Sequence, residues 1–127
     1  AFEATLLLAQ EDIPNHPFIP YHRINYATII AKHLQLYDSA EHMIHSAQMR
    51  LLANFPGRIN DIKRAELRRG FCLWKLGKLE EGHQIIANCY NYFTETNRPD
   101  LNQEARGYLD QMEPLVADQK IVSASGN

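Results

Sequence analysis

The sequence predicts an all-α fold, an α-α superhelix of antiparallel helical hairpins with about five to six helices. One observation behind this prediction is an internal repeat: two helix-like stretches come into register when the chain is shifted by 42 residues, the separation of Leu34 from Leu76. The other is that no segment shows the sustained apolar–polar alternation of a half-buried strand. Repeats of roughly 20 to 50 residues are typical of solenoids, whose concave faces bind other molecules.

The positions that coincide in this shift hold apolar or small residues, while the residues between them differ. This pattern is expected when a hairpin is duplicated and only its packing is retained. The coincident pairs are Thr28 and Gly70, Ala31 and Leu73, Leu34 and Leu76, Tyr37 and Leu79, Ala40 and Gly82, Met43 and Ile85, Ile44 and Ile86, and Ala47 and Cys89.

The first segment, residues 1–12, reads as the end of a preceding helical unit, with Phe2 and Leu6 on one stripe. Because it begins in mid-helix and without an initiator Met, we expect the chain to be a fragment of a longer protein. Residues 12–20 contain three prolines and form a predicted loop. Pro20 suits the first turn of the next helix, where its missing N–H has no partner to lose.

The first predicted repeat spans residues 21–55. Its helices are 21–36 and 38–54, each with apolar or small residues at helical spacing. Asp38 and Ser39 are placed to cap the second of these helices.

The second predicted repeat spans residues 58–97, with helices over 60–76 and 79–97. Gly77 lies between them as a helix-terminating glycine. A terminal helix is expected over 99–113, and a frayed polar tail over 118–127.

Composition favours one ordinary globular domain, because 127 residues with 45% hydrophobic content can bury a core. The net charge of −2 gives no overall basic field, so we expect no direct nucleic-acid contact. No apolar run approaches the ~20 residues of a membrane helix, and Leu6–Leu8 is too short for a signal peptide. We expect a cytoplasmic protein in which Cys72 and Cys89 are reduced core thiols.

Small and large residues follow one order in both repeats. They are Thr28, Tyr37, Ala40, Ile44 and Ala47 in the first, and Gly70, Gly77, Leu79, Gly82, Ile86 and Cys89 in the second. At these positions the chain resembles the tetratricopeptide-repeat family over residues 21–97. It departs from that family at Gln35, which replaces the turn glycine, and in its 42-residue period, against about 34. Longer units are similar to the sensor domains of bacterial regulators, including peptide-pheromone receptors.

The resemblance implies that a concave groove, lined by the first helix of each repeat, binds a peptide or a partner protein. Family members grip peptide amides with Asn and carboxylates with Lys or Arg. Carried over by register, the groove residues are His22, Asn25, Ile29, Lys32, His33, Arg64, Leu67, Phe71, Trp74 and Lys75.

Each of these positions also has a structural interpretation. Trp74 is equally suited to packing beneath the Gly77 turn. Arg64, Arg68 and Arg69 are compatible with a solvated helix face that pairs locally with acidic residues.

The sequence proposes no active site. His42 and His45 are three residues apart on one helix, but no third ligand joins them at close spacing, so we expect no metal. Phosphate-binding, dinucleotide-binding and hydrolase motifs are absent from the sequence, and no cofactor is expected.

The leading hypothesis is therefore a non-enzymatic interaction domain, the sensor of a bacterial signalling or transcription regulator. Two alternatives stay open: a self-association domain that forms a homodimer, and a fragment of a phosphatase of response regulators.

Overall fold

The computed structural model describes residues 18–125, and the side chains of residues 18–118. The described residues form five helices and no strand, which confirms the predicted all-α fold. The helices are α2 (Phe18–Leu34), α3 (Tyr37–Asn54), α4 (Ile59–Lys75), α5 (Leu79–Glu95) and α6 (Pro99–Ser125). The unit expected over residues 1–12 lies outside the described residues.

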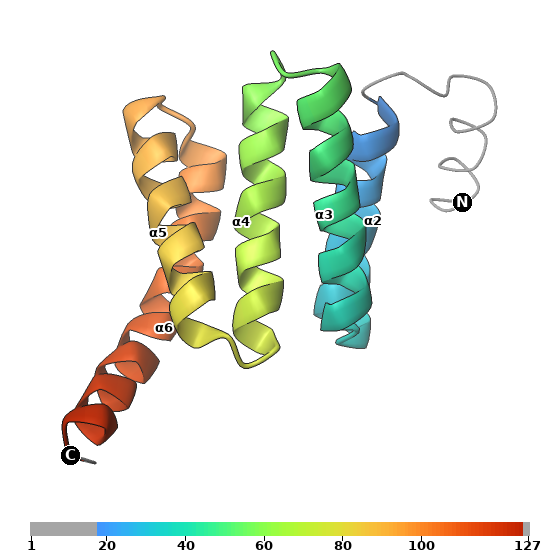
Figure 1. The fold of residues 1–127 in the computed structure, drawn as a ribbon. Helices are drawn as coiled ribbons and strands as arrows, with labels where there is room; N and C mark the ends of the chain where they lie inside the picture. Colours follow the sequence, from blue (N-terminus) through green and yellow to red (C-terminus); the bar gives the residue numbers. More distant parts are fainter. Residues whose placement is uncertain (1–17, 126–127) are drawn as a thin grey trace.

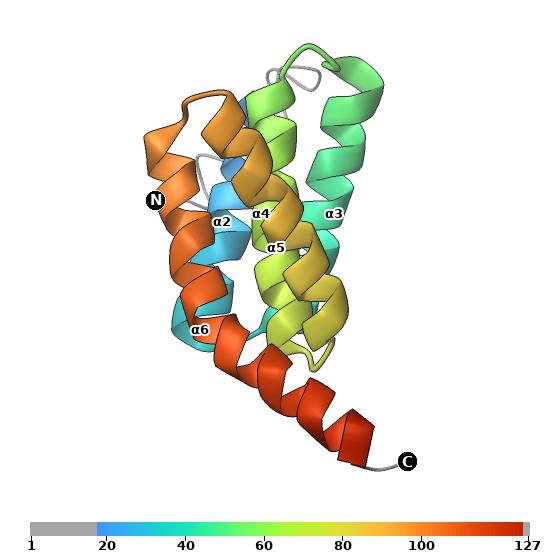
Figure 2. The same cartoon turned by 90° about the vertical axis from the view of Figure 1, so that its left-hand side faces the viewer.

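Each helix packs antiparallel against the next, so the chain forms a row of hairpins (Figure 1). In addition, α2 contacts α4 and α4 contacts α6, whereas α3 and α5 make no contact with each other. Helices α2 and α6 likewise make no backbone contact with each other, but each lies beside α4 (Figure 2). Side chains from these three helices meet on one face.

Three predicted helix starts, at residues 21, 38 and 60, differ from the observed ones at Phe18, Tyr37 and Ile59, and the predicted loop over residues 12–20 is wrong for residues 18–20, which are helical. Helix α2 begins at Phe18 and holds Pro20 in its first turn, as the expected role of that proline requires. The predicted cap by Asp38 and Ser39 is wrong, because α3 begins at Tyr37 and no side chain caps it. Asp38 lies inside the first turn instead, where a carboxylate still favours the positive end of the helix dipole.

The predicted end of the last helix near Pro114 is also wrong. Helix α6 runs through this proline to Ser125, so residues 118–125, which were expected to fray, belong to the helix. A proline inside a helix removes one backbone hydrogen bond and crowds the preceding turn, but it does not oblige the helix to stop. Met112, just before it, is fully buried and holds this part of α6 to the body.

The core divides into two clusters that share α4. One joins α2, α3 and α4 around Ile44 and Leu51, and the other joins α4, α5 and α6 around Phe93. Ala40 and Gly82, the matched small positions of the expected repeat, are both buried.

The two cysteines are buried free thiols, as expected. Cys72 belongs to the cluster of α2, α3 and α4, and Cys89 to the cluster of α4, α5 and α6. Burial raises the pKa of each thiol to about 12, with nearby acidic side chains adding to the effect. Neither thiol is therefore activated as a nucleophile.

Three helix ends place a residue in the left-handed backbone region: Gln35 with φ 57°, Gly77 with φ 93° and Asn97 with φ 55°. After α4, the N–H of Lys78 donates to the carbonyl of Leu73, as in a Schellman motif. Gln35 lies 42 residues before Gly77, so the position where the repeat lacks its glycine still requires a glycine-like conformation.

We therefore expect Gln35→Gly to stabilise the domain. A side chain in the left-handed region costs about 1–2 kcal/mol, and glycine relieves this cost at the expense of more entropy in the unfolded chain. The net gain should be about 0.5–1 kcal/mol in urea unfolding. Gly77→Gln is the reciprocal change and should lower the free energy of unfolding. A loss of stability in Gln35→Gly would contradict the assignment of strain to this turn.

Candidate functional site

Helix α4 presents a polar and aromatic stripe between α2 and α6. Its members recur at helical spacing, so they share one face. The stripe contacts side chains of both neighbouring helices, and together they form what we call the α2–α4–α6 face. Its residues are Tyr21, Asn25 and Lys32 of α2, Arg64, Arg68, Phe71 and Lys75 of α4, and Glu104 and Tyr108 of α6.

Arg68 is the centre of this face. Its guanidinium donates to both carboxylate oxygens of Glu104 at 3.3 Å and to Oδ1 of Asn25 at 2.9 Å. The hydroxyl of Tyr108 donates to the same carboxylate at 2.9 Å. One guanidinium thus connects α4 to α2 and α6 at once.

The charge state of this network follows from its surroundings. Burial raises the pKa of Glu104, but the charge of Arg68, the hydrogen bonds from Arg68 and Tyr108 and the charge of Lys32 outweigh it, so the pKa is lowered on balance. Burial and the neighbouring carboxylate raise the pKa of Tyr108. Glu104 is accordingly an ionised acceptor and Tyr108 a protonated donor, which makes the network a fixed support rather than an acid–base pair.

Two lysines converge beside this network on one aromatic ring. The Nζ atoms of Lys32 and Lys75 each lie 5.8 Å from the ring centre of Phe71. Lys32 also lies 5.4 Å from the ring centre of Tyr108, and Lys75 lies 4.1 Å from that of Trp74. Both lysines are exposed, and neither forms an ion pair with a described residue. Their charges are available to a ligand.

Arg64 is held more firmly than these lysines. It donates to Oδ1 of Asp61 at 2.8 Å and lies over the ring of Tyr21 at 5.4 Å, with 16% of its side chain exposed. Its guanidinium is therefore engaged within the protein, although it shares the carboxylate of Asp61 with Arg58.

The structure brings together five of the ten predicted groove residues: Asn25, Lys32, Arg64, Phe71 and Lys75. Ile29 lies one turn beyond Asn25 and is 46% exposed. His22 stacks edge-on against Phe18, 3.8 Å away, and His33 is exposed near the end of α2.

Two predicted groove residues belong to the core instead. Leu67 is fully buried, and Trp74 is 9% exposed in the same cluster of α4, α5 and α6. The predicted stripe of groove residues on α4 was therefore too wide. Leu67 is three residues after Arg64, and Trp74 is three residues after Phe71. Both side chains pack against α5 and α6 instead of facing outward. For Trp74, the structural interpretation, packing near the Gly77 turn, is the one that the structure supports.

Four residues of this face were missed by the sequence interpretation: Tyr21, Arg68, Glu104 and Tyr108. Helical spacing offered a signal for two of them, since Arg68 is four residues after Arg64 and Tyr21 four before Asn25. Glu104 and Tyr108 had no such signal, because nothing in the repeat placed the last helix beside α4.

In the part of the chain that the structure describes, no group of three His, Cys, Asp or Glu side chains is placed to hold a metal ion. None of the helices there is both long and apolar enough to cross a lipid bilayer. No family model matches the chain, and no curated protein or solved structure matches it. A proposal about function therefore depends on the residues themselves.

Proposed function

We propose that this chain is a non-enzymatic binding domain that captures a peptide or partner protein on its α2–α4–α6 face. The observation that carries the proposal is the pair Lys32 and Lys75, whose exposed ammonium groups approach one ring and form no close ion pair with a described residue, although the charge of Lys32 also acts on Glu104. The host protein would be a cytoplasmic signalling or transcription regulator of a bacterium.

Several features support a tetratricopeptide-like superhelix as the architecture of this domain. Gln35 and Gly77, 42 residues apart, both have a positive φ. Ala40 and Gly82, also 42 residues apart, are both buried. A stack of such hairpins presents its first helices on one side, which is where α2, α4 and α6 meet.

The α2–α4–α6 face contains side chains that bond to one another and side chains that are available to a ligand. Arg68, Glu104 and Tyr108 satisfy one another, so they hold the three helices in place without requiring a ligand. Lys32 and Lys75 retain unused donors for carboxylates, and Phe71 between them offers apolar surface. An acidic segment with a neighbouring apolar side chain matches this arrangement in charge and polarity.

The double variant Lys32→Ala/Lys75→Ala should weaken peptide binding at least tenfold while leaving the melting temperature almost unchanged. Each charge-assisted hydrogen bond to a carboxylate is worth about 1.5–3 kcal/mol, whereas removing exposed charges costs little stability. The measurement is calorimetric titration of an acidic peptide, selected on the wild-type domain by phage display, at low and high salt. Wild-type binding should weaken with salt because the lysines are exposed.

The matched control is Lys78→Ala/Arg106→Ala, which removes two exposed cations outside this face. It should bind the peptide as the wild type does. Equal affinity in both double variants would place the ligand elsewhere, and a concentration-dependent mass in solution would then favour self-association.

A further inference from the structure

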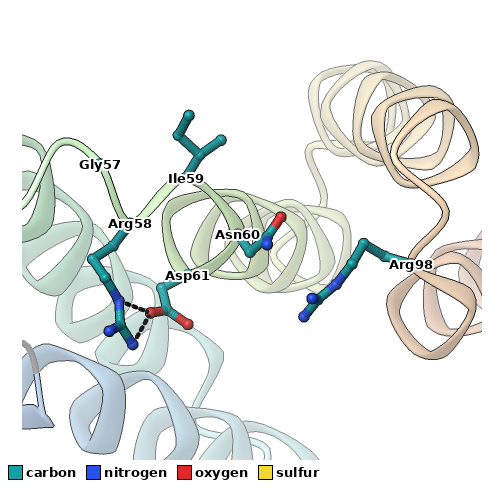
Figure 3. Close-up of a pocket in the computed structure, with 6 residues that line it drawn as sticks. All are labelled: Gly57, Arg58, Ile59, Asn60, Asp61 and Arg98. Atoms are coloured by element: carbon teal, nitrogen blue, oxygen red, sulfur yellow. Dashed lines mark hydrogen bonds and ion pairs between the residues drawn. The ribbon is translucent and has the colours of Figure 1, made fainter.

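A second polar site lies away from the α2–α4–α6 face, between the turn that precedes α4 and the start of α6. It is a cavity of about 260 Å³, open to solvent, at the end of the domain opposite the Gly77 turn (Figures 1 and 3). Its lining residues are Gly57, Arg58, Ile59, Asn60, Asp61 and Arg98.

The single carboxylate of this cavity is already saturated. Oδ2 of Asp61 accepts a hydrogen bond of 2.8 Å from Nε of Arg58 and forms an ion pair with Nη2 of the same guanidinium at 2.8 Å, while Oδ1 accepts a hydrogen bond of 2.8 Å from Arg64. Figure 3 shows Asp61 turned toward Arg58 and away from Arg98. Two arginines therefore neutralise one acid, and the cavity is left with excess positive charge.

The positive charge of the cavity that no carboxylate offsets is that of Arg98. This residue precedes α6, and Figure 3 shows its side chain extending toward Asn60. Its Nε is buried and has no hydrogen-bond partner among the described residues, and it forms no ion pair with any of them. The terminal nitrogens of this permanently charged group, rather than the buried Nε, are the donors that an anion in the cavity would meet.

Backbone N–H groups at the start of α4 are further hydrogen-bond donors for an anion. Helix α4 begins at Ile59 without a side-chain cap, so the N–H groups of its first turn have no intrahelical acceptor. Arg58 occupies the cap position of α4, and Asp61 in the first turn is the anion that offsets this cation at the positive end of the helix dipole. Asn60 supplies a side-chain amide beside these N–H groups.

We propose that this cavity binds a phosphate group carried as a monoester. Guanidinium, amide and backbone donors approach from α4 on one side and from Arg98 on the other. A tetrahedral anion with three free oxygens can accept from both sides, whereas a planar carboxylate has only two oxygens to share. The site is independent of the peptide proposal, because none of its lining residues belongs to the α2–α4–α6 face.

The test is titration of the ¹⁵N-labelled domain with inorganic phosphate at constant ionic strength, observed by NMR. The amides of Ile59 and Asn60 and the Nε–H of Arg98 should shift together and saturate. In Arg98→Gln the affinity should fall about tenfold or more, while the rest of the spectrum stays that of the folded wild type. Acetate at equal concentration should bind more weakly than phosphate.

Lys78→Gln is the matched control, since it removes a cation from the cap position of α5, at the opposite end of the domain. It should bind phosphate as the wild type does. O-Phosphoserine and glycerol 3-phosphate, compared at equal concentration, distinguish a modified protein chain from a small ester as the source of the group. The proposal would be overturned if the shifts did not saturate, if they were spread over the whole surface, or if Arg98→Gln bound phosphate as tightly as the wild type.

Discussion

Gly82→Ala should destabilise the domain by about 1–3 kcal/mol, the usual range for overpacking a close contact. A Cβ built at this position would lie 2.7 Å from the carbonyl oxygen of Gly70 and 2.9 Å from the backbone nitrogen of Trp74. Both atoms belong to the backbone of α4, so neither can rotate aside, and the two helices must separate. Gly82→Leu should be worse and is expected to prevent stable folding.

The control is Gly107→Ala in α6, because a Cβ there would meet nothing within 4 Å. It should stabilise the domain by about 0.5–1 kcal/mol through helix propensity alone. Urea unfolding of both variants measures the difference directly. A stability in Gly82→Ala equal to that of the wild type would mean that α4 and α5 do not approach as closely as described.

Arg68→Met should also be severely destabilising, by about 2–4 kcal/mol at neutral pH. Methionine keeps much of the apolar stem but removes the partner of Glu104, and breaking a buried ion pair from one side costs about 3–5 kcal/mol. We expect somewhat less, because 16% of the Arg68 side chain and 19% of the Glu104 side chain are exposed. Adding Glu104→Gln to Arg68→Met should recover part of the loss, since the unpaired charge disappears.

The pH dependence of this variant provides an independent check. In the wild type the folded pKa of Glu104 is lowered, so its contribution is complete above the unfolded value near 4.3 and is lost as the pH falls through the folded value. Without Arg68, burial dominates and raises the folded pKa above the unfolded one. The gap in stability between wild type and variant should therefore narrow from pH 7 to pH 4. A gap that is constant with pH would assign the loss to packing instead.

The sequence predicted the helices of residues 18–97 to within a few residues because the periodic pattern of small and large residues records the packing of each hairpin. Gly70 and Gly82 show why: the helices can approach at these positions only if both residues are small, and that requirement is visible in the residue types. The extent of α6 was not predictable in the same way. Pro114 is a stop signal on average, and the helix passes through it.

The candidate site was predictable only in part, for a geometric reason. A stripe on one helix is fixed by a spacing of three to four residues, which identified Lys32, Phe71 and Lys75. How many residues of the stripe stay exposed depends on where the neighbouring helices lie. Helices α5 and α6 cover Leu67 and Trp74, so these two residues belong to the core. Glu104 reaches Arg68 across 36 residues of sequence, and no local pattern records such a pairing.

The division of the core gives the molecule a pair of internal probes. Cys72 reports on one cluster and Cys89 on the other, and α4 is common to both. With a pKa of about 12, either thiol is ionised in roughly one molecule in ten thousand at pH 8, so a thiol reagent reacts almost only when that cluster opens. Comparing the labelling rates of the two cysteines therefore distinguishes a domain that unfolds as one cooperative unit from one whose halves open separately around a persistent central helix.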